Sequence, residues 1–188
     1  MKRRVYMKNL GTKTIETERL RLRKFELTDA EDMFKNWASD DEVTQFLTWP
    51  THKDVEVSRR VLETWVKGYS DDKNYQWCIE LKSTGEAIGS IAVVEYKENI
   101  EAVEIGYCIG RKYWNQSFTS EAFKALIQFF FQKIGANRIE SRHDSLNQNS
   151  GKVMLKCGLK YEGTRIKADR NNTGICDVAM YGILNRRL

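Results

Sequence analysis

The chain has 188 residues, of which 11% are aromatic and 30% charged, and a formal net charge of +5. This length suits one domain with a sizeable core, and this aromatic content excludes an intrinsically disordered chain. The charges are interspersed in sign, no basic run suggests nucleic-acid binding, and no apolar run suggests a membrane helix or a secretory signal. We therefore expect a single domain over 1–188, with 1–14 as a loosely ordered N-terminal extension.

The four cysteines are Cys78, Cys108, Cys157 and Cys176. They are far apart, they show no paired spacing, and the chain has two histidines to accompany them. This pattern favours neither a zinc site nor a disulfide framework. We expect reduced thiols, no metal and a cytoplasmic location.

The first third of the chain predicts one strand and two helices. Leu20 and Leu22 alternate with arginines, which is typical of a half-buried strand. Thr28 and Glu31 have the spacing of a capping box, which favours the start of a helix. A second helical pattern runs over 54–69.

Three β-prone runs with short turns between them follow, and they suggest an antiparallel meander over 75–81, 87–96 and 102–109. The remaining expected elements are a helix over 118–134, a strand over 138–143, a helix over 147–156 and strands over 159–167 and 178–184.

The segment 101–122 joins the third of these strands to a helix through a polar, basic loop. A strand, a short loop and a helix start bring backbone N–H groups to one point, where the helix dipole also favours negative charge. This arrangement predicts a site for a phosphate-bearing cofactor.

Three segments resemble the GNAT superfamily of acetyl-CoA-dependent N-acetyltransferases, and the first two lie within 101–122. They are EIGYCIG at 104–110, RKYWNQSFTSEA at 111–122 and NRIESRHDSLNQNSGKVMLKCGLKYEG at 137–163. The opening TERLRLRKF is typical of the branch that includes the ribosomal-protein N-terminal acetyltransferases. The resemblance implies an α/β (α+β) fold with a central mixed, mostly antiparallel sheet flanked by helices. That sheet would splay between its fourth and fifth strands, here 102–109 and 138–143, and acetyl-CoA would enter the splay.

The resemblance also implies which residues hold the pantetheine arm. Backbone groups of Cys108, Ile109 and Gly110 would bind it, and an N–H near Ile109 would polarise the thioester carbonyl, where negative charge develops. Asn147 and Ser150 match the family's N-x-x-S element. Asn147 would contact pantetheine and Ser150 would protonate the leaving thiolate, with helix capping as the alternative for both.

The family's pyrophosphate loop has two glycines in a W-G-x-G-x-A arrangement, from which this chain departs. Its loop consists of Trp114, Asn115, Gln116, Ser117, Phe118 and Thr119. Asn tolerates a left-handed backbone, so Asn115 can preserve the turn, whereas Ser117 adds a Cβ that could crowd the phosphates and a hydroxyl that could bind them. This departure leaves open a degenerate domain that binds CoA or a partner without turnover.

The acceptor amine must lose a proton before it attacks, and Glu104 is the candidate base, directly or through a water. An exposed glutamate paired with a lysine or arginine is the alternative. Strand alternation places Glu104 and Cys108 on one face, with Tyr107 on the other. Trp49, beside Pro50 in the least regular stretch, is the candidate substrate contact.

We therefore expect an enzyme that moves an acetyl group directly from acetyl-CoA to a primary amine. A covalent enzyme intermediate is not expected, because no cysteine has an evident base partner. The acceptor is a protein N-terminal α-amine, towards which the branch leans, or a small molecule such as a polyamine, an amino acid or an antibiotic. A homodimer and a nucleic-acid-binding module suggested by the net charge are left open.

Overall fold

The computed structural model describes residues 7–185 of the chain. Its strands are β1 (Ile15–Glu16), β2 (Leu20–Arg23), β3 (Gln76–Leu81), β4 (Ala87–Lys97), β5 (Ala102–Ile109), β6 (Arg138–Asp144), β7 (Lys160–Asn171) and β8 (Gly174–Leu184). Its α-helices are α1 (Ala30–Met33), α2 (Asp41–Thr44), α3 (Val55–Gly68), α4 (Phe118–Phe129) and α5 (Gln148–Lys156). Short 3₁₀ or π turns cover Leu27–Asp29, Phe34–Ala38, Glu98–Ile100, Arg111–Tyr113 and Phe130–Ile134.

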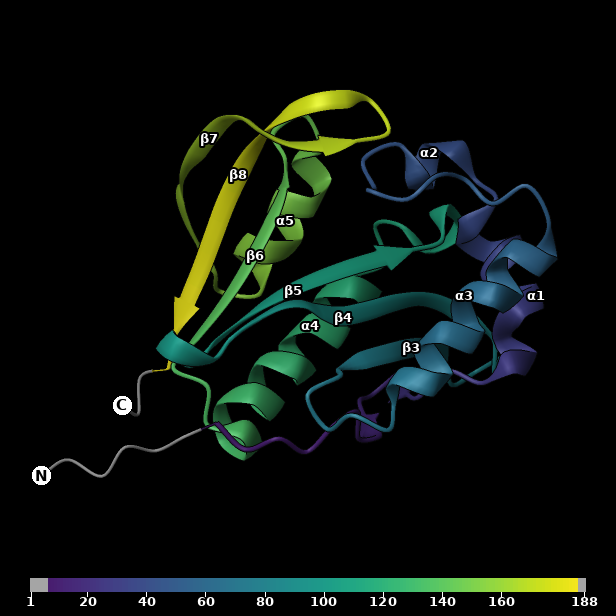
Figure 1. Ribbon diagram of the computed structural model, residues 1–188, viewed down its shortest axis with the longest axis horizontal. Coiled ribbons are helices and arrows are strands. Elements are labelled where there is room, and N and C mark those ends of the chain that lie inside the picture. Colours follow the sequence, from purple (N-terminus) through teal and green to yellow (C-terminus); the bar gives the residue numbers. More distant parts are fainter. Residues whose placement is uncertain (1–6, 186–188) are drawn as a thin grey trace, which may run out of the picture.

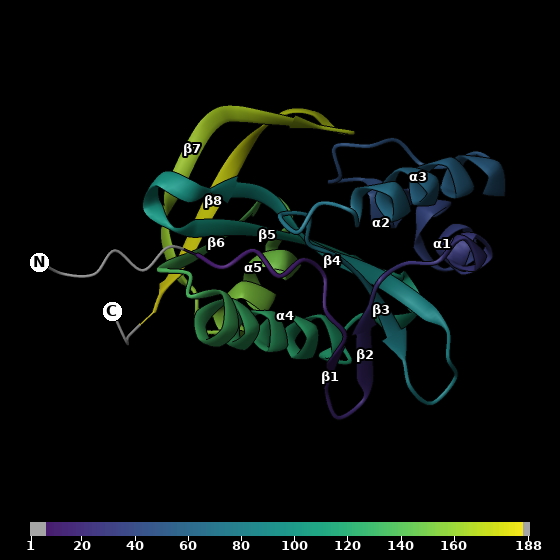
Figure 2. The ribbon, with the colours of Figure 1, turned by 60° about the horizontal axis from the view of Figure 1, so that its bottom comes forward.

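The strands form one eight-stranded sheet in the order β1-β2-β3-β4-β5-β6-β8-β7. All neighbouring pairs are antiparallel except β5 and β6, which are parallel. Helices α1 to α3 lie on one side of the sheet, and α4 and α5 lie on the other (Figure 1, Figure 2). The expected fold class and the β3–β4–β5 meander are therefore confirmed.

The parallel pair separates after a short contact. β5 and β6 are paired in register over three positions, from Ala102↔Arg138 to Glu104↔Glu140. One residue further along, the Ser141 hydroxyl donates to the Ile105 carbonyl (2.7 Å), and beyond it the two strands diverge (Figure 1). These are the strands expected to be the fourth and fifth, and the two-residue β1 shifts their numbers by one.

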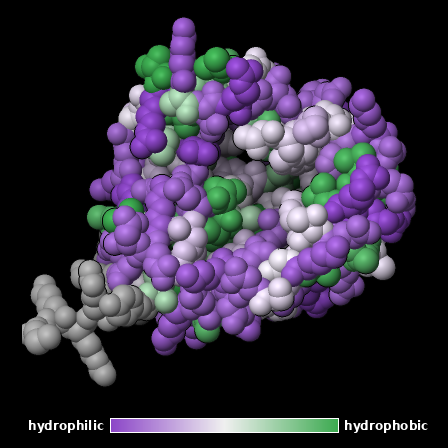
Figure 3. All heavy atoms as spheres, viewed as in Figure 1, coloured by the Kyte–Doolittle hydropathy of each residue, from purple (hydrophilic) through white to green (hydrophobic). Residues whose placement is uncertain are grey.

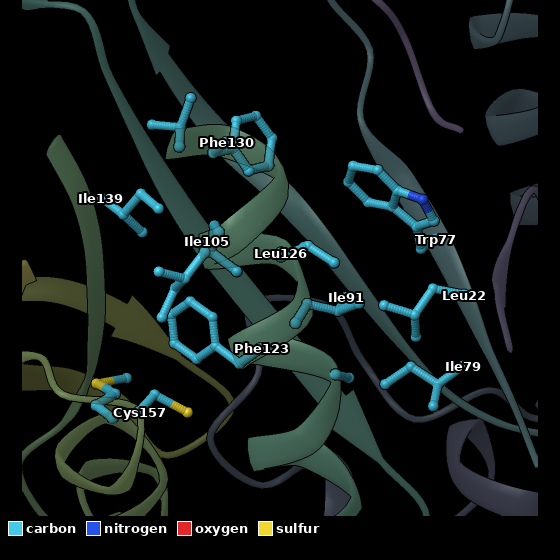
Figure 4. Packing of buried hydrophobic residues seen from close by; sticks show 14 of the residues in the cluster. Leu22, Trp77, Ile79, Ile91, Ile105, Phe123, Leu126, Phe130, Ile139 and Cys157 are labelled. Atoms are coloured by element: carbon cyan, nitrogen blue, oxygen red, sulfur yellow. The ribbon is translucent and has the colours of Figure 1, made fainter. Parts of the chain in front are cut away.

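Two apolar clusters hold the sheet between its helices. The larger one lies between the sheet and α4 and includes Trp77, Ile105, Phe123, Leu126 and Phe130 (Figure 4). The smaller one lies on the opposite face against α1 and α3, and it contains Phe25, Trp37, Leu62, Cys78 and Cys108. Because Ile105 and Cys108 belong to different clusters, the alternation expected for β5 is confirmed.

The N-terminal segment differs from the expectation. The Lys8 N–H donates to the Ile134 carbonyl (2.9 Å), and the Leu10 N–H donates to the Tyr75 hydroxyl (3.1 Å). The Trp77 indole N–H donates to the Lys13 carbonyl (2.7 Å). Loose order is therefore wrong for residues 8–13, whereas residues 1–6 lie outside the described residues.

The first helix also begins differently. The N-cap is Glu26, whose N–H donates to the Asp29 carboxylate (2.8 Å), so the capping box expected from Thr28 and Glu31 is wrong. Asp29 is buried and binds the Arg23 guanidinium through both oxygens (2.8 Å each), which fixes the carboxylate at the start of the turn. Asp29, inside the expected pattern, thus takes the role expected of Glu31, and its pairing with Arg23 holds it there.

The last hairpin is longer than expected. β7 continues to Asn171 and β8 begins at Gly174, so the pair reaches well beyond 159–167 and 178–184. Most of β7 is exposed at the edge of the sheet, which removes the apolar alternation from which a strand is predicted. No helix within residues 7–185 has the length and apolar character required to cross a bilayer.

Candidate active site

Two contiguous cavities open from the gap between β5 and β6. The first, of about 640 Å³, lies between the end of β5, the loop before α4 and the start of α5. The second, of about 350 Å³, lies over β5 and β6, between the segment after α2 and the tip of the β7–β8 hairpin. The corresponding face of the molecule is hollowed (Figure 3). The residues that line both cavities are Phe46, Leu47, Tyr107, Cys108, Asn147 and Ser150.

The end of β5 presents backbone groups to the first cavity. The Gly110 N–H donates to the Ile88 carbonyl of β4 (2.9 Å), and Ile109 is opposite Gly89 in the same antiparallel ladder. Bonded and non-bonded pairs alternate in such a ladder, so the Ile109 N–H points away from β4 toward the gap. By the same alternation the Cys108 N–H faces β4. Of the three residues expected to bind the cofactor through their backbone, Ile109 therefore has its N–H directed toward the gap, whereas the N–H groups of Cys108 and Gly110 face β4.

The loop before α4 adopts the backbone that glycines favour, without containing them. Asn115 has φ 61° and Ser117 has φ 66°, both in the left-handed region. This conformation costs a non-glycine residue roughly 1–2 kcal/mol, so the surrounding contacts must maintain it. Trp114 supplies one of them, because its indole N–H donates to the Ile109 carbonyl (3.0 Å).

Lys156 also contacts this loop, and this contact was not predicted from the sequence. The Lys156 ammonium donates to the Ser117 hydroxyl (2.6 Å). Lys152 and Lys156 both line the first cavity, as do Phe118 and Thr119 at the start of α4. The spacing of the two lysines, four residues apart on an expected helix, is the signal that would have indicated a basic stripe facing the loop.

Two of the expected cofactor residues lie outside this lining. The Gly110 N–H is hydrogen-bonded to β4. The Gln116 side chain donates to the Lys112 carbonyl (2.9 Å), and its backbone carbonyl accepts from Arg19 (3.1 Å). Both residues shape the loop, whereas Trp114, Asn115 and Ser117 contribute directly to the cavity wall.

The start of α5 joins the two cavities. Asn147 is its N-cap, and the Asn147 side chain accepts from the Ser150 N–H (3.4 Å), so the capping alternative is observed for Asn147. The Tyr107 hydroxyl donates to the Ser150 carbonyl (2.8 Å), which ties α5 to β5 across the gap. Capping does not remove Asn147 or Ser150 from the site, because both line the two cavities.

Glu104 lies in the second cavity with 1% of its surface exposed. One carboxylate oxygen is 3.1 Å from Arg142 Nε, and the other is 3.7 Å from Lys97 Nζ. Burial raises the pKa of Glu104, and the charges of Arg142 and Lys97 act against that rise. Glu104 is thus paired with an arginine and a lysine, as in the alternative to a base, but it is buried rather than exposed.

Trp49 also lines the second cavity. Its ring lies 5.2 Å from that of His52, and its carbonyl accepts from Asn172 of the β7–β8 tip (2.8 Å). The structure therefore brings Trp49 and Glu104 to one cavity, although they are far apart in the sequence. No group of three or more His, Cys, Asp or Glu side chains that could hold a metal occurs within the described chain.

Comparison with known proteins adds to this geometry. Residues 19–160 match the family model described as an acetyltransferase (GNAT) domain. The curated relatives include an uncharacterized N-acetyltransferase, p20, of Bacillus licheniformis, which is 32% identical over 92% of this chain and 97% of the relative.

Similar solved structures include a GNAT-family acetyltransferase from Bacillus anthracis, with 26% identity, a TM-score of 0.81 and coverage of 92% of this chain and 99% of that one. They also include the microcin C7 self-immunity acetyltransferase MccE, solved with acetyl-CoA and AMP, with 19% identity, a TM-score of 0.80 and coverage of 89% and 93%. At that identity the second likeness concerns the fold alone. The sequence and the fold point to the same family.

Proposed function

Because the chain belongs to the GNAT family of acetyl-CoA-dependent N-acetyltransferases, we propose that it acetylates a primary amine held beside Glu104 in the second cavity. The observation that carries this proposal is the junction of the two cavities at Tyr107, Cys108, Asn147 and Ser150. A cofactor in one cavity and an amine in the other would meet there, with a buried carboxylate close by.

The residues of the first cavity fit the phosphates of CoA. The left-handed backbone at Asn115 and Ser117 leads into the twelve-residue helix α4, whose N-terminal N–H groups favour an anion. Lys156 adds positive charge at the same loop. Bound acetyl-CoA supplies an activated thioester carbonyl. These features support a functional cofactor loop over the degenerate domain that the missing glycines had left open.

The residues at the junction can be assigned to the transfer. Glu104 accepts the proton that the amine loses, directly or through a water, and its raised pKa makes it a stronger base than an exposed carboxylate. The Ile109 N–H stabilises negative charge that develops on the carbonyl oxygen. As the new C–N bond forms and the C–S bond breaks, the Ser150 hydroxyl would provide a proton to the leaving sulfur and regain one from solvent.

The cysteines support a direct transfer without an acyl-enzyme. Burial raises the pKa of Cys108 to about 12, and burial raises the pKa of Cys157 to about 11. A cysteine nucleophile needs its thiolate form, which such pKa values suppress near neutral pH. All four cysteines are free thiols, which also supports the proposed cytoplasmic location.

The acceptor is proposed as a primary amine in either of two forms, a protein N-terminal α-amine or a small molecule. Both present the same nitrogen to Glu104, so the chemistry above applies to each. A homodimer, which the sequence leaves open, also stays a proposal.

The test is a steady-state assay of CoA thiol release with a broad panel of primary amines, with the acetylated product identified by mass. We expect turnover with at least one amine and intersecting lines in two-substrate plots, because both substrates bind before reaction. Parallel lines would indicate an acyl-enzyme and refute direct transfer. Absence of any acetylated amine, with acetyl-CoA bound, would refute the enzyme assignment.

A further inference from the structure

The tip of the β7–β8 hairpin is attached to the segment that follows α2. The Asn172 backbone N–H donates to the Leu47 carbonyl (3.1 Å). The Asn172 side-chain amide donates to the carbonyls of Thr44 (2.9 Å) and Trp49 (2.8 Å). We call these three hydrogen bonds the Asn172 bridge. In Figure 1 and Figure 2 the hairpin tip reaches the α2 region from the other side of the gap between β5 and β6.

The neighbouring residue fixes the same tip to the sheet. The Asn171 side-chain amide donates to the buried carboxylate of Asp144, at the end of β6 (2.7 Å). The Asn171 side-chain oxygen accepts from the N–H of Thr173 (2.8 Å) and from its hydroxyl (2.7 Å). The tip is therefore held on two sides: Asn171 attaches it to β6, and Asn172 attaches it to the segment after α2.

The second cavity lies between the parts that this tip joins. Leu47 and Trp49 line one wall, Asp169 and Asn171 line another, and Glu104 belongs to the same lining. The hairpin wall is also linked to the candidate base, because Arg142 is 3.1 Å from Glu104 and 3.4 Å from Asp169. A change in the position of the tip would therefore change the shape of the cavity that contains Glu104.

The two walls that the hairpin tip joins limit which acceptor molecules can approach Glu104. The cavity volume of about 350 Å³ lies at the lower end of the range of roughly 300–1,000 Å³ for small-molecule sites. We take this volume, and the two walls that the bridge joins, to favour a small amine over the N-terminal segment of a folded protein.

We propose that the Asn172 bridge sets the acceptor size and that the acceptor is a small primary amine rather than the N-terminus of a folded protein. This inference rests on the proposed function and refines its substrate class. Asn172 acts through the wall it holds, so it is a specificity-determining residue and does not take part in proton transfer.

The test compares Asn172→Ala with the wild type over one graded panel. The panel contains spermidine, free amino acids, peptides of two to eight residues with a free α-amine, and a folded protein with a free N-terminus. Asn99→Ala is the matched control, because Asn99 is an exposed asparagine outside both cavity linings. Product mass identifies the acetylated amine in each case.

We expect the wild type to favour the small amines and to leave the folded protein almost unmodified. In Asn172→Ala the ratio of kcat/KM for the longer peptides to that for the best small amine should rise at least about tenfold, equivalent to about 1.4 kcal/mol. Asn99→Ala should keep the wild-type ratio.

Three results would count against the inference. If the wild type acetylates the folded protein as efficiently as the best small amine, the size restriction is refuted while the proposed function stands. If Asn172→Ala keeps the wild-type ratio, the role of the Asn172 bridge in setting acceptor size is refuted, and the proposed function again stands. If no amine of any size is acetylated, the proposed function fails and the inference fails with it.

Hydrogen exchange gives a second readout that needs no turnover. The amide of residue 172 should exchange slowly in the wild type, because it is bonded to the Leu47 carbonyl. In Asn172→Ala the same amide should exchange faster, while amides in the core strand β5 keep their wild-type rates. Fast exchange at residue 172 in the wild type would show that the bridge does not hold the tip in solution.

Discussion

The carboxylate of Glu104 is buried in the floor of the second cavity and has two cations nearby. Burial raises its pKa, whereas Arg142 and Lys97 stabilise its charged form. The net direction is upward, so this carboxylate is more basic than one on the surface. A group in this state suits a proton acceptor, because catalytic efficiency increases as the pKa of a base approaches the working pH.

Glu104→Gln should lower kcat by about two orders of magnitude or more, since the amide cannot accept the proton. In the wild type, kcat/KM should fall as the pH drops through the raised pKa of Glu104, and this acidic limb should be absent from the variant. Glu95→Gln is the control, because Glu95 is a more exposed glutamate that also pairs with Lys97 (3.2 Å). Unchanged rate and pH profile in Glu104→Gln would show that another group is the base.

The proposed role of Lys156 depends on a contact between two distant segments. Its ammonium reaches Ser117 from α5, 39 positions away along the chain. Lys156→Gln should weaken acetyl-CoA binding by about tenfold, and the loss should shrink at high salt, because screening already weakens the charge contribution in the wild type.

Calorimetry at low and high salt checks this expectation, with Lys160→Gln as the control, since Lys160 is exposed and lines neither cavity. An affinity unchanged in Lys156→Gln at both salt concentrations would remove Lys156 from the phosphate site.

The resemblance to the family could indicate part of this site. Glu104, Asn147 and Ser150 were expected from motif positions, and each lies in a cavity where the reaction could occur. Arg142 and Asn172 were not expected, because nothing in the local pattern of a strand or a turn says which distant carbonyl or carboxylate it will meet. Their roles come from tertiary contacts.

At the scale of elements, the strand–loop–helix unit from β5 to α4 is fixed from outside as well as from within. Glu121, in the first turn of α4, accepts from the Thr17 hydroxyl (2.6 Å), the Arg19 N–H (2.9 Å) and the Arg19 guanidinium (2.8 Å). Burial acts to raise the pKa of Glu121, but these hydrogen bonds outweigh it and hold the pKa below its ordinary value. The turn between β1 and β2 thereby supports the helix that begins at the cofactor loop.

Glu121→Gln should lower the free energy of unfolding near neutral pH by roughly 1.5–3 kcal/mol, the range for hydrogen bonds to a charged group. The folded-state pKa of Glu121 is depressed, so its contribution is present above the unfolded pKa of about 4.3 and is lost as the pH falls through the folded value. Denaturant unfolding from pH 7 to pH 3 measures this.

The difference between variant and wild type should therefore be largest near neutral pH and should disappear at the acidic end. Glu18→Gln, at an exposed glutamate in the same turn, should show little change at any pH. A constant difference across the whole range would mean that the carboxylate charge is not what stabilises the turn.

Elements with strong local patterns were predicted well, and elements built by context were not. The meander and α4 follow from alternation and from a wide apolar face. The start of the first helix involves Asp29 pairing, and the extension of β7 and β8 occurs in an exposed edge hairpin. Such features leave little trace in hydrophobic periodicity.

At the scale of the whole molecule, the divergence of β5 and β6 creates both cavities. Three paired positions hold the strands together at one end, and the Tyr107–Ser150 hydrogen bond spans the gap at the other. The resemblance to a known family predicted the splay. The contact between the β7–β8 tip and the segment after α2 was not among the features that the resemblance implied.

The central claim is that the first cavity binds acetyl-CoA although its loop lacks the two glycines. Calorimetric titration of the purified wild-type protein with acetyl-CoA, and separately with CoA, tests it most directly. Because Asn115 and Ser117 already hold the left-handed backbone and Lys156 lies beside them, we predict saturable binding of both ligands in the micromolar range. No detectable binding at millimolar ligand would contradict the account.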